Sequence, residues 1–394
     1  MPLDLSRRSL LAGASGLGVA GLAAGCSQAT TPAASTAASA ASTVAEAAFP
    51  GGIDPYLLGP AEGVALLSRN ENPFGPPQSA LDMIEYAASK GAYYASQGAP
   101  RMLMEMIAER NGVEPEQVVL STGSGEVLSA IALVYGPNGP VVAPRLFWDT
   151  TTLYAGNLGM ATIDRVPLTE GMEIDLAGIE ARVSEDTGLV QLCNPNNPTG
   201  LVSDPATFQA SVRRMAASTT VLVDEAYIEL SDDPDANSCV PLIQEGLDVI
   251  VTRTFSKIYG MAGIRVGYAI ASLEAAQRIR SAVMSWAPST SYAAGIGAYN
   301  DFEFLDYSRS KIIEGREMVT AVCDELGLEY LPSQTNFVYF KSGLEANDVR
   351  AAMAERKISI RGQYMDYNEW TRVSMGRLED VERFCLALPE VLNA

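Results

Sequence analysis

Short runs of apolar, mostly β-branched residues are the feature of this sequence that most constrains its fold. They lie at residues 117–121, 141–143, 189–193, 221–224 and 249–252, and longer amphipathic stretches separate them. Strands that are hydrophobic at every position, rather than at alternate positions, are buried on both faces, as in a parallel sheet covered by helices. The spacing therefore predicts an α/β fold.

The pattern changes after about residue 280. Long helices are expected at residues 301–326 and 346–355, with a short strand at 336–340. A chain of 394 residues also exceeds the roughly 250–300 residues at which single cores stop growing. We therefore expect a large α/β domain followed by a smaller α+β domain.

The chain contains no histidine, which excludes Ser-His-Asp and Cys-His catalysis and every metal site that needs an imidazole. It has 27 Lys and Arg against 47 Asp and Glu, a formal net charge of −20. Because nucleic acids are bound through clustered Lys and Arg, no nucleic-acid partner is expected. No metal is expected either. The chemistry must use lysine, carboxylate, tyrosine, arginine or a cofactor.

The first residues look like an export signal rather than part of the fold. Arg7 and Arg8 precede an apolar run at residues 10–25 that is shorter than the roughly 20 residues of a membrane-spanning helix. The segment resembles a twin-arginine signal that ends in a lipoprotein-type box, with Cys26 as the lipidated residue. Cleavage without lipid is the alternative. Residues 26–48, rich in Ala, Ser and Thr, are expected to be a flexible linker.

Four cysteines follow this segment. They are scattered and have no CxxC spacing, so we expect buried free thiols, although one disulfide stays possible: Cys193, Cys239, Cys323 and Cys385.

Four polar motifs follow predicted strands, where a parallel sheet binds its ligands. A Gly-rich turn at 121–126 precedes an apolar helix and could bind an anion such as phosphate. Residues 194–200 form a turn fixed by two prolines, and 224–227 begin with an acid that leaves an apolar strand. Residues 254–265 place Lys257 in a Gly-rich apolar turn, where desolvation would make it nucleophilic.

Each motif alone also has an ordinary structural explanation. The first is a tight turn and the second a loop, Asp224 suits a helix N-cap, and Lys257 could be a surface lysine. Together, in this order, they resemble the fold-type I pyridoxal-phosphate enzymes, class I and II aminotransferases, and among them histidinol-phosphate aminotransferases. Residues 70–75 and 371–376 add to the resemblance, which covers about residue 53 to the C-terminus.

The resemblance implies a large domain with a mainly parallel seven-stranded sheet between helices, and a smaller α+β domain. The expected divisions are a signal at 1–25, a linker at 26–48, an N-terminal segment at 49–90 that packs with the small domain, a large cofactor-binding domain at 91–280 and a small domain at 281–394.

The resemblance also implies pyridoxal 5′-phosphate as cofactor. Lys257 would form the internal aldimine and move protons, Asp224 would pair with the pyridine nitrogen, and Tyr227 with Asn197 would bind the phenolic oxygen. Trp148 would stack on the ring. The residues that would hold the cofactor phosphate are Ser124, Gly125, Thr254, Ser256 and Arg265, with Tyr94 (or Tyr93) reaching from a neighbouring subunit of a homodimer.

Arg372 is expected to bind the substrate α-carboxylate, and Tyr56 and Arg361 to contact its distal part. Asn72 is expected to be a further substrate-binding residue. The implied reaction is transfer of an amino group between an amino acid, or a similar amine, and a 2-oxo acid. Two alternatives remain open at this point. One is a decarboxylase, lyase, racemase or cyclase on the same scaffold, and the other is a non-catalytic binding protein of the cell envelope.

Overall fold

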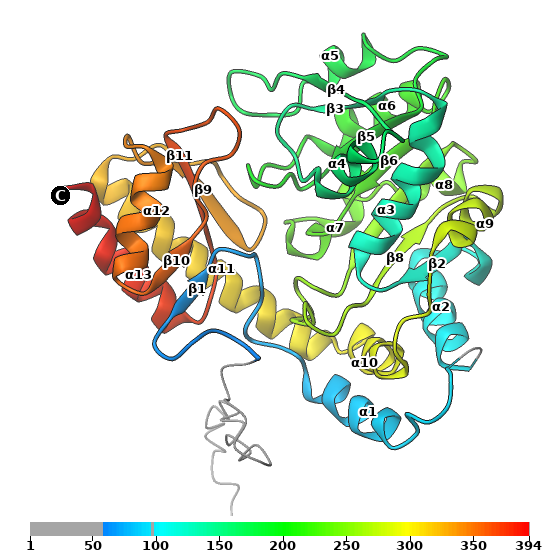
Figure 1. Cartoon of the computed structure of the whole chain (residues 1–394), viewed down its shortest axis with the longest axis horizontal. Coiled ribbons are helices and arrows are strands. Elements are labelled where there is room, and N and C mark those ends of the chain that lie inside the picture. Colours follow the sequence, from blue (N-terminus) through cyan, green and yellow to red (C-terminus); the bar gives the residue numbers. More distant parts are fainter. Residues whose placement is uncertain (1–57, 96–97, 394) are drawn as a thin grey trace, which may run out of the picture. The chain divides into compact units, whose positions relative to one another are not determined.

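A seven-stranded sheet forms the centre of the larger part of this computed structural model, which describes residues 58–95 and 98–393 (Figure 1). Its strand order is β2-β8-β7-β6-β5-β3-β4. Only β8 runs antiparallel to its neighbours, so the sheet is mainly parallel as expected. The strands are β2 (Val118–Ser121), β3 (Val141–Pro144), β4 (Ile163–Val166), β5 (Leu189–Cys193), β6 (Val221–Asp224), β7 (Val249–Thr254) and β8 (Gly267–Ile270).

Both faces of this sheet are buried, which explains why its strands are apolar throughout. In β6, Val221 and Val223 join one core while Leu222 joins another on the opposite face. The core around Leu222 includes side chains of α3 (Ser124–Tyr135), α4 (Thr150–Asn157) and α9 (Leu273–Ala282). The core around Val221 and Val223 includes α2 (Gly98–Asn111), α6 (Pro205–Met215), α8 (Val240–Gln244) and α10 (Ser289–Tyr299). The short helices α5 (Leu176–Glu180) and α7 (Pro234–Asn237) lie in connecting segments.

The smaller part contains two short sheets. β11 (Trp370–Ser374) pairs antiparallel with β9 (Phe337–Lys341), and β1 (Ala65–Leu67) pairs parallel with β10 (Ile358–Ile360). Helices α11 (Phe302–Leu326), α12 (Ala346–Glu355) and α13 (Leu378–Leu392) pack with them. Through β1, a segment near the start of the described chain becomes part of the C-terminal elements. α1 (Gln78–Ala88) packs on α10.

Several predicted elements match closely. Residues 189–193 and 221–224 are strands, and 346–355 is a helix at the expected bounds. The helix expected at 301–326 begins at Phe302 because Asp301 is its N-cap, whose side chain accepts from the N–H of Phe304. The four cysteines within the described residues are free thiols; three are buried and Cys385 is half-buried.

The predicted signal, the linker, Cys26 and Tyr56 lie outside the described residues. Among the described residues, no helix combines the length and the apolar character needed to cross a membrane.

Candidate active site

A cavity of about 780 Å³ opens at the carboxyl ends of the central strands. Segments after β2, β5, β6 and β7 reach it, together with residues of the smaller part. The following residues singled out from the sequence line this cavity: Ser124, Gly125, Trp148, Asn197, Asp224, Tyr227, Thr254, Ser256, Lys257, Arg265, Arg361 and Arg372. Residues up to 248 positions apart are thus brought together.

Lys257 follows β7 and is enclosed within this site. Its Nζ donates to the main-chain oxygen of Asn70 at 3.1 Å and lies 5.4 Å from the ring centroid of Tyr227. Burial lowers the pKa of Lys257 to about 8, helped by the positive charge of Arg372 and opposed by Asp224. At mildly alkaline pH a large share of this amine is therefore neutral and nucleophilic, which a solvated surface lysine is not.

Asp224 ends β6 and is buried, with 4% of its surface exposed. Burial raises its pKa to about 6, while the Thr252 hydroxyl, 3.1 Å from Oδ1, and the main-chain N–H of Ala226 lower it. The helix N-cap explanation is wrong, because the next helical turn begins only at Ile228 and Tyr227 precedes it. At neutral pH Asp224 is a buried carboxylate that faces the cavity.

Tyr227 presents its hydroxyl to the same space. The side-chain N–H groups of Asn70 and Asn197 donate to it at 2.9 and 3.3 Å. Its ring packs edge-on against Phe337, with the centroids 5.4 Å apart. Burial raises the pKa of Tyr227, so its hydroxyl keeps a proton that it can donate into the cavity.

The start of α3 forms a cradle for an anion. Gly123 caps the helix with a φ of 72°, and a Cβ there would lie 2.2 Å from Nη2 of Arg265. Gly267 is equally constrained, since its Cβ would lie 2.1 Å from the main-chain nitrogen of Ser124. The helix N-terminus and a guanidinium thus approach each other only because glycine occupies these positions, and both attract negative charge. Ser256 and Thr254 add hydroxyls to this side of the cavity.

Arg372 lies in β11 and is buried, with 4% of its surface exposed. Its Nη1 donates to Oδ1 of Asn197 at 2.6 Å and its Nη2 to the main-chain oxygen of Ser68 at 3.0 Å. Its Nε has no partner among the described residues. Both of its partners are neutral, so this buried cation still requires an anion. Arg361 stacks on Tyr364, 5.0 Å from its ring centroid, at the same end of the cavity.

The structure departs from the sequence-based expectation for Asn72. Its side-chain N–H groups donate to the main-chain oxygens of Lys257 and Ile258, and to the Ser308 hydroxyl. Its Oδ1 accepts from the N–H of Phe74, and the residue does not line the cavity. Asn72 supports the turn that carries Lys257, whereas a substrate contact was expected.

Asn70 is the residue that the sequence analysis missed. Its side chain donates to Tyr227, and its Oδ1 accepts from the Ser374 hydroxyl at 2.7 Å. It is buried and adopts a left-handed conformation with φ of 55°, which is uncommon for a residue other than glycine. Its partners lie 157 and 304 positions away, so the motif at 70–75 indicated the segment but not the role of Asn70.

Tyr93 and Tyr94 lie away from this cavity, at a second hollow of about 810 Å³. Tyr94 is 89% exposed and packs edge-on against Trp286, which is itself 63% exposed. Neither tyrosine reaches the first cavity of its own chain.

Comparison with known proteins adds an independent result. The family model described as aminotransferase class I and II matches residues 62–388. Histidinol-phosphate aminotransferase from Halalkalibacterium halodurans is 34% identical over 337 residues, which are 84% of this chain and 90% of that protein. Histidinol-phosphate aminotransferase from Akkermansia muciniphila is 34% identical over 335 residues, 84% of this chain and 90% of that protein.

Solved structures give the same result. Histidinol-phosphate aminotransferase from Sinorhizobium meliloti, in complex with pyridoxal 5′-phosphate, superimposes with a TM-score of 0.75 at 30% identity. The match covers 84% of this chain and 91% of that one. A putative histidinol-phosphate aminotransferase from Erwinia carotovora atroseptica gives a TM-score of 0.78 at 27% identity, covering 83% and 95%.

Proposed function

Since the chain belongs to the class I and II aminotransferases and performs pyridoxal-phosphate-dependent transamination, we propose that Arg372 binds the α-carboxylate of both its donor amino acid and its 2-oxo-acid acceptor. One observation carries this proposal. Arg372 is a buried guanidinium at the cavity whose hydrogen-bond partners are neutral oxygens and whose Nε is free among the described residues. A carboxylate would accept two parallel hydrogen bonds from it and supply the missing negative charge.

The cavity residues fit pyridoxal phosphate. The anion cradle at the start of α3 suits the phosphate, Asp224 suits the protonated pyridine nitrogen, and Tyr227 suits the phenolic oxygen. Trp148 lines the cavity and is available to stack on the ring. When bound, the cofactor supplies an aldehyde that condenses with amines and a ring that withdraws electrons from the substrate Cα.

The chain's own residues would then position the substrate and move protons. Lys257, with a pKa near 8, holds an amine close enough to neutrality to take up and return a proton at Cα. Asp224 stays ionised above about pH 6 and would keep the ring nitrogen protonated. Tyr227, which keeps its proton, would donate a hydrogen bond to the phenolic oxygen. Arg372 would fix the orientation of the bond that breaks.

We propose that the distal part of one substrate is anionic. Arg361 and Arg69 both line the cavity, and Arg361 stacks there on Tyr364. The relatives named above are histidinol-phosphate aminotransferases, whose name states a phosphorylated substrate. A phosphate or a second carboxylate on the substrate would suit these two cations. Because Glu71 also lines the cavity, the anionic group would have to lie away from its carboxylate.

Steady-state kinetics with the cofactor-loaded protein test both assignments. Donors with an α-carboxylate, donors without one, and histidinol phosphate are compared at a fixed 2-oxo acid. We expect Arg372→Ala to reduce kcat/KM for every α-carboxylate substrate by roughly 30-fold or more, as for other truncated buried charge pairs. Arg361→Ala should raise KM only for substrates with an anionic distal group. Equal loss for carboxylate-free amines in Arg372→Ala would contradict the assignment of Arg372.

We also propose that the active enzyme is a homodimer. Met284 is 91% exposed and joins Tyr93, Tyr94 and Trp286 around the second hollow, an apolar surface that a monomer seldom exposes. A second copy would cover these side chains, and Tyr94 would then be free to reach the partner's cofactor phosphate.

We propose that residues 1–25 direct export by the twin-arginine route to the periplasm or cell envelope, with Cys26 as a possible lipid anchor. The support is Arg7 and Arg8 before a short apolar run. Because this route moves folded proteins, the cofactor would be loaded before export. Arg7→Lys/Arg8→Lys should leave the active protein in the cytoplasm, measured by cell fractionation. Unchanged export of this variant would exclude the route.

A further inference from the structure

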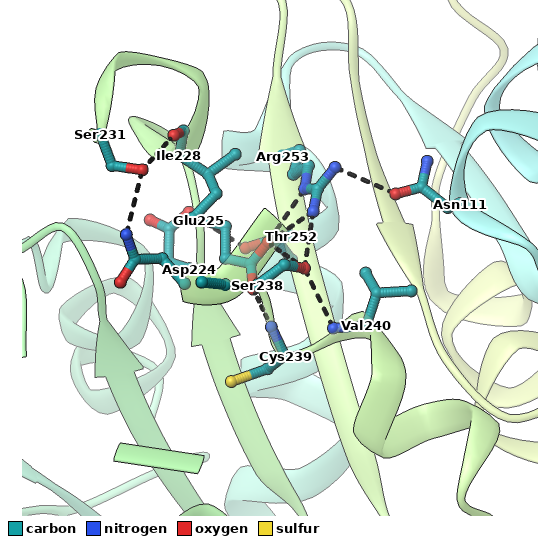
Figure 2. Close-up of polar contacts among 12 residues, drawn as sticks. Asn111, Asp224, Glu225, Ile228, Ser231, Ser238, Cys239, Val240, Thr252 and Arg253 are labelled. Carbon is teal, nitrogen blue, oxygen red and sulfur yellow. Dashed lines mark hydrogen bonds and ion pairs between the residues drawn. The ribbon is translucent and has the colours of Figure 1, made fainter. Parts of the chain in front are cut away.

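A second polar cluster lies at the ends of β6 and β7, around Glu225 and Arg253 (Figure 2), and neither of these two residues lines the active-site cavity. At its centre is Glu225, whose surface is fully buried. Its Oε2 accepts from Nε and Nη2 of Arg253 at 3.0 and 2.8 Å, and from the Ser238 hydroxyl at 3.2 Å. Its Oε1 accepts from the main-chain N–H of Cys239 at 2.6 Å. Burying a carboxylate without hydrogen-bond donors would be costly, and these four donors compensate the burial of Glu225.

The cluster and the active site are joined through consecutive residues. In the β6–β7 register Asp224 lies opposite Thr252, and their side chains are hydrogen-bonded on the cavity side. Glu225, which directly follows β6, and Arg253, the next residue of β7, form the ion pair on the rear. Successive side chains of a strand point to opposite faces, so one pair of strand ends carries both interactions. The N–H of Glu225 donates to the Thr252 oxygen at 2.8 Å and continues the ladder.

The ion pair also connects these strand ends to their surroundings. Arg253 donates to Oδ1 of Asn111, the last residue of α2, at 3.0 Å and to the Ser238 hydroxyl at 2.8 Å. Ser238 and Cys239 precede α8. Tyr227 is two residues beyond Glu225, so the direction in which the chain leaves β6 toward Tyr227 depends on where Glu225 is held.

Charge links the two faces as well. The carboxylate of Glu225 raises the pKa of its neighbour Asp224, although burial is the largest cause of that rise. Arg253 is the cation that pairs with Glu225. The pKa of Arg253 is raised: burial opposes the rise, and the charge and hydrogen bond of Glu225, together with Tyr268 and Glu229, outweigh it. The Thr252 hydroxyl, the Ala226 N–H and Lys257 also act on the pKa of Asp224, and Asp224 in turn raises the pKa of Cys193. At the rear, Glu229 and Tyr268 act on Arg253, and Arg213 acts on Cys239.

We propose that the Glu225–Arg253 ion pair is a positioning device for transamination. The pair holds the ends of β6 and β7 so that Asp224 and Tyr227 face the cofactor. Within it, the positive charge of Arg253 cancels the negative charge of Glu225 next to Asp224. Neither residue of the pair lines the cavity, but both are joined by peptide bonds to residues that do. The proposal rests on the aminotransferase function given above.

Four variants test this proposal: Glu225→Gln, Arg253→Gln, the double variant and Arg253→Lys. Each is prepared both as apoprotein, for cofactor affinity, and loaded with cofactor, for kinetics. For each, the affinity of the apoprotein for pyridoxal phosphate and kcat/KM are measured from pH 5 to 9, with Tm measured in parallel. Arg253→Gln leaves Glu225 uncompensated, so the acid-side midpoint of both profiles should rise by roughly one pH unit. Glu225→Gln leaves Arg253 uncompensated, so the midpoint should fall.

The double variant should return the midpoint close to that of the unaltered protein, because no charge is then left behind Asp224. Arg253→Lys keeps the charge and loses the planar fork, so it should lower Tm without moving the midpoint. If the Gln variants fail to fold, Arg253→Lys carries the test, because a midpoint that moves although the charge is kept would contradict the proposal. Midpoints that stay in place in Glu225→Gln and Arg253→Gln, with activity falling only as Tm falls, would overturn the proposal. Activity of the unaltered protein in the same assay tests the aminotransferase function separately.

Discussion

At the scale of single residues, the site depends on three buried charges whose environments differ. Lys257 is held near neutrality by burial and by Arg372, Asp224 stays ionised only above about pH 6, and Arg372 has neutral partners. In the protein alone, each of these three groups therefore lacks a partner of opposite charge that would fully stabilise its charged form. Cofactor and substrate would supply the missing groups, which is how a site can bind both strongly.

These pKa values predict how the apoprotein captures the cofactor at different pH. The amine of Lys257 must be neutral to attack an aldehyde, so the rate should rise as the pH passes through about 8. Below about pH 6 Asp224 becomes protonated, and affinity should fall as well. Stopped-flow recording of the cofactor's visible band from pH 5 to 9.5 measures the rate. A rate that is independent of pH between 7 and 9 would contradict the lowered pKa of Lys257.

Asn70→Ala tests the residue that sequence analysis missed. The change removes the donor to Tyr227 and the acceptor for Ser374 but keeps the main-chain oxygen that accepts from Lys257. We expect kcat to fall by about 10-fold and the visible band of the bound cofactor to shift, because Tyr227 loses one partner.

Lys357→Ala is the matched control for this prediction. Lys357 is also a left-handed residue, with φ of 59°, and it lies outside the cavity. It should leave kcat and the visible band unchanged. If the control reproduces the loss seen in Asn70→Ala, backbone conformation and not the Asn70 side chain is responsible.

At the scale of elements, the start of α3 is the feature most sensitive to a small change. Gly123 has a positive φ, and Nη2 of Arg265 approaches within 2.2 Å of where its Cβ would be. Gly123→Ala should displace Arg265, strain the backbone by about 1–3 kcal/mol and weaken cofactor affinity at least 10-fold. Titration of the apoprotein with pyridoxal phosphate measures this. Gly171→Ala, in a turn away from the cavity with an open Cβ position, should bind normally; unchanged affinity in Gly123→Ala would rule out the cradle.

The elements of the sheet were predictable because their sequences are extreme. Residues 221–223 are apolar at every position, which is typical of a strand covered on both faces, and the acidic Asp224 marks the end of that strand. The rear cluster was not predictable in the same way. Glu225 and Arg253 look like ordinary charged residues in sequence, and their pairing follows from the β6–β7 register.

At the scale of the whole molecule, the site is assembled from distant parts of the chain. Arg372 comes from the smaller part, Lys257 from the larger, and Asn70 connects them from the segment after β1. The motifs predicted which residue types would meet at the sheet. The predicted role of Asn72 was wrong. Its hydrogen bonds to the turn that carries Lys257 follow from the path of the segment after β1, which the sequence does not indicate.

The exposed aromatic surface predicts the assembly of the molecule. Trp286→Ser removes the largest apolar side chain from the hollow that contains Tyr94. We expect this variant to shift from dimer toward monomer in sedimentation velocity experiments, while its far-ultraviolet circular dichroism stays unchanged. Trp148, in the cavity, is not suitable as a control, so Tyr86→Ser, on exposed α1, serves instead. An unaltered protein that is monomeric at every concentration would contradict the dimer.

The covalent attachment of the cofactor tests the account most directly. The chain has five lysines, Lys90, Lys257, Lys311, Lys341 and Lys357. The holoprotein is reduced with borohydride, digested and analysed by mass spectrometry. We predict that the pyridoxyl-phosphate mass is found on the peptide that contains Lys257 and that Lys257→Ala abolishes it. The same mass on another lysine, with Lys257 unmodified, would contradict the central claim.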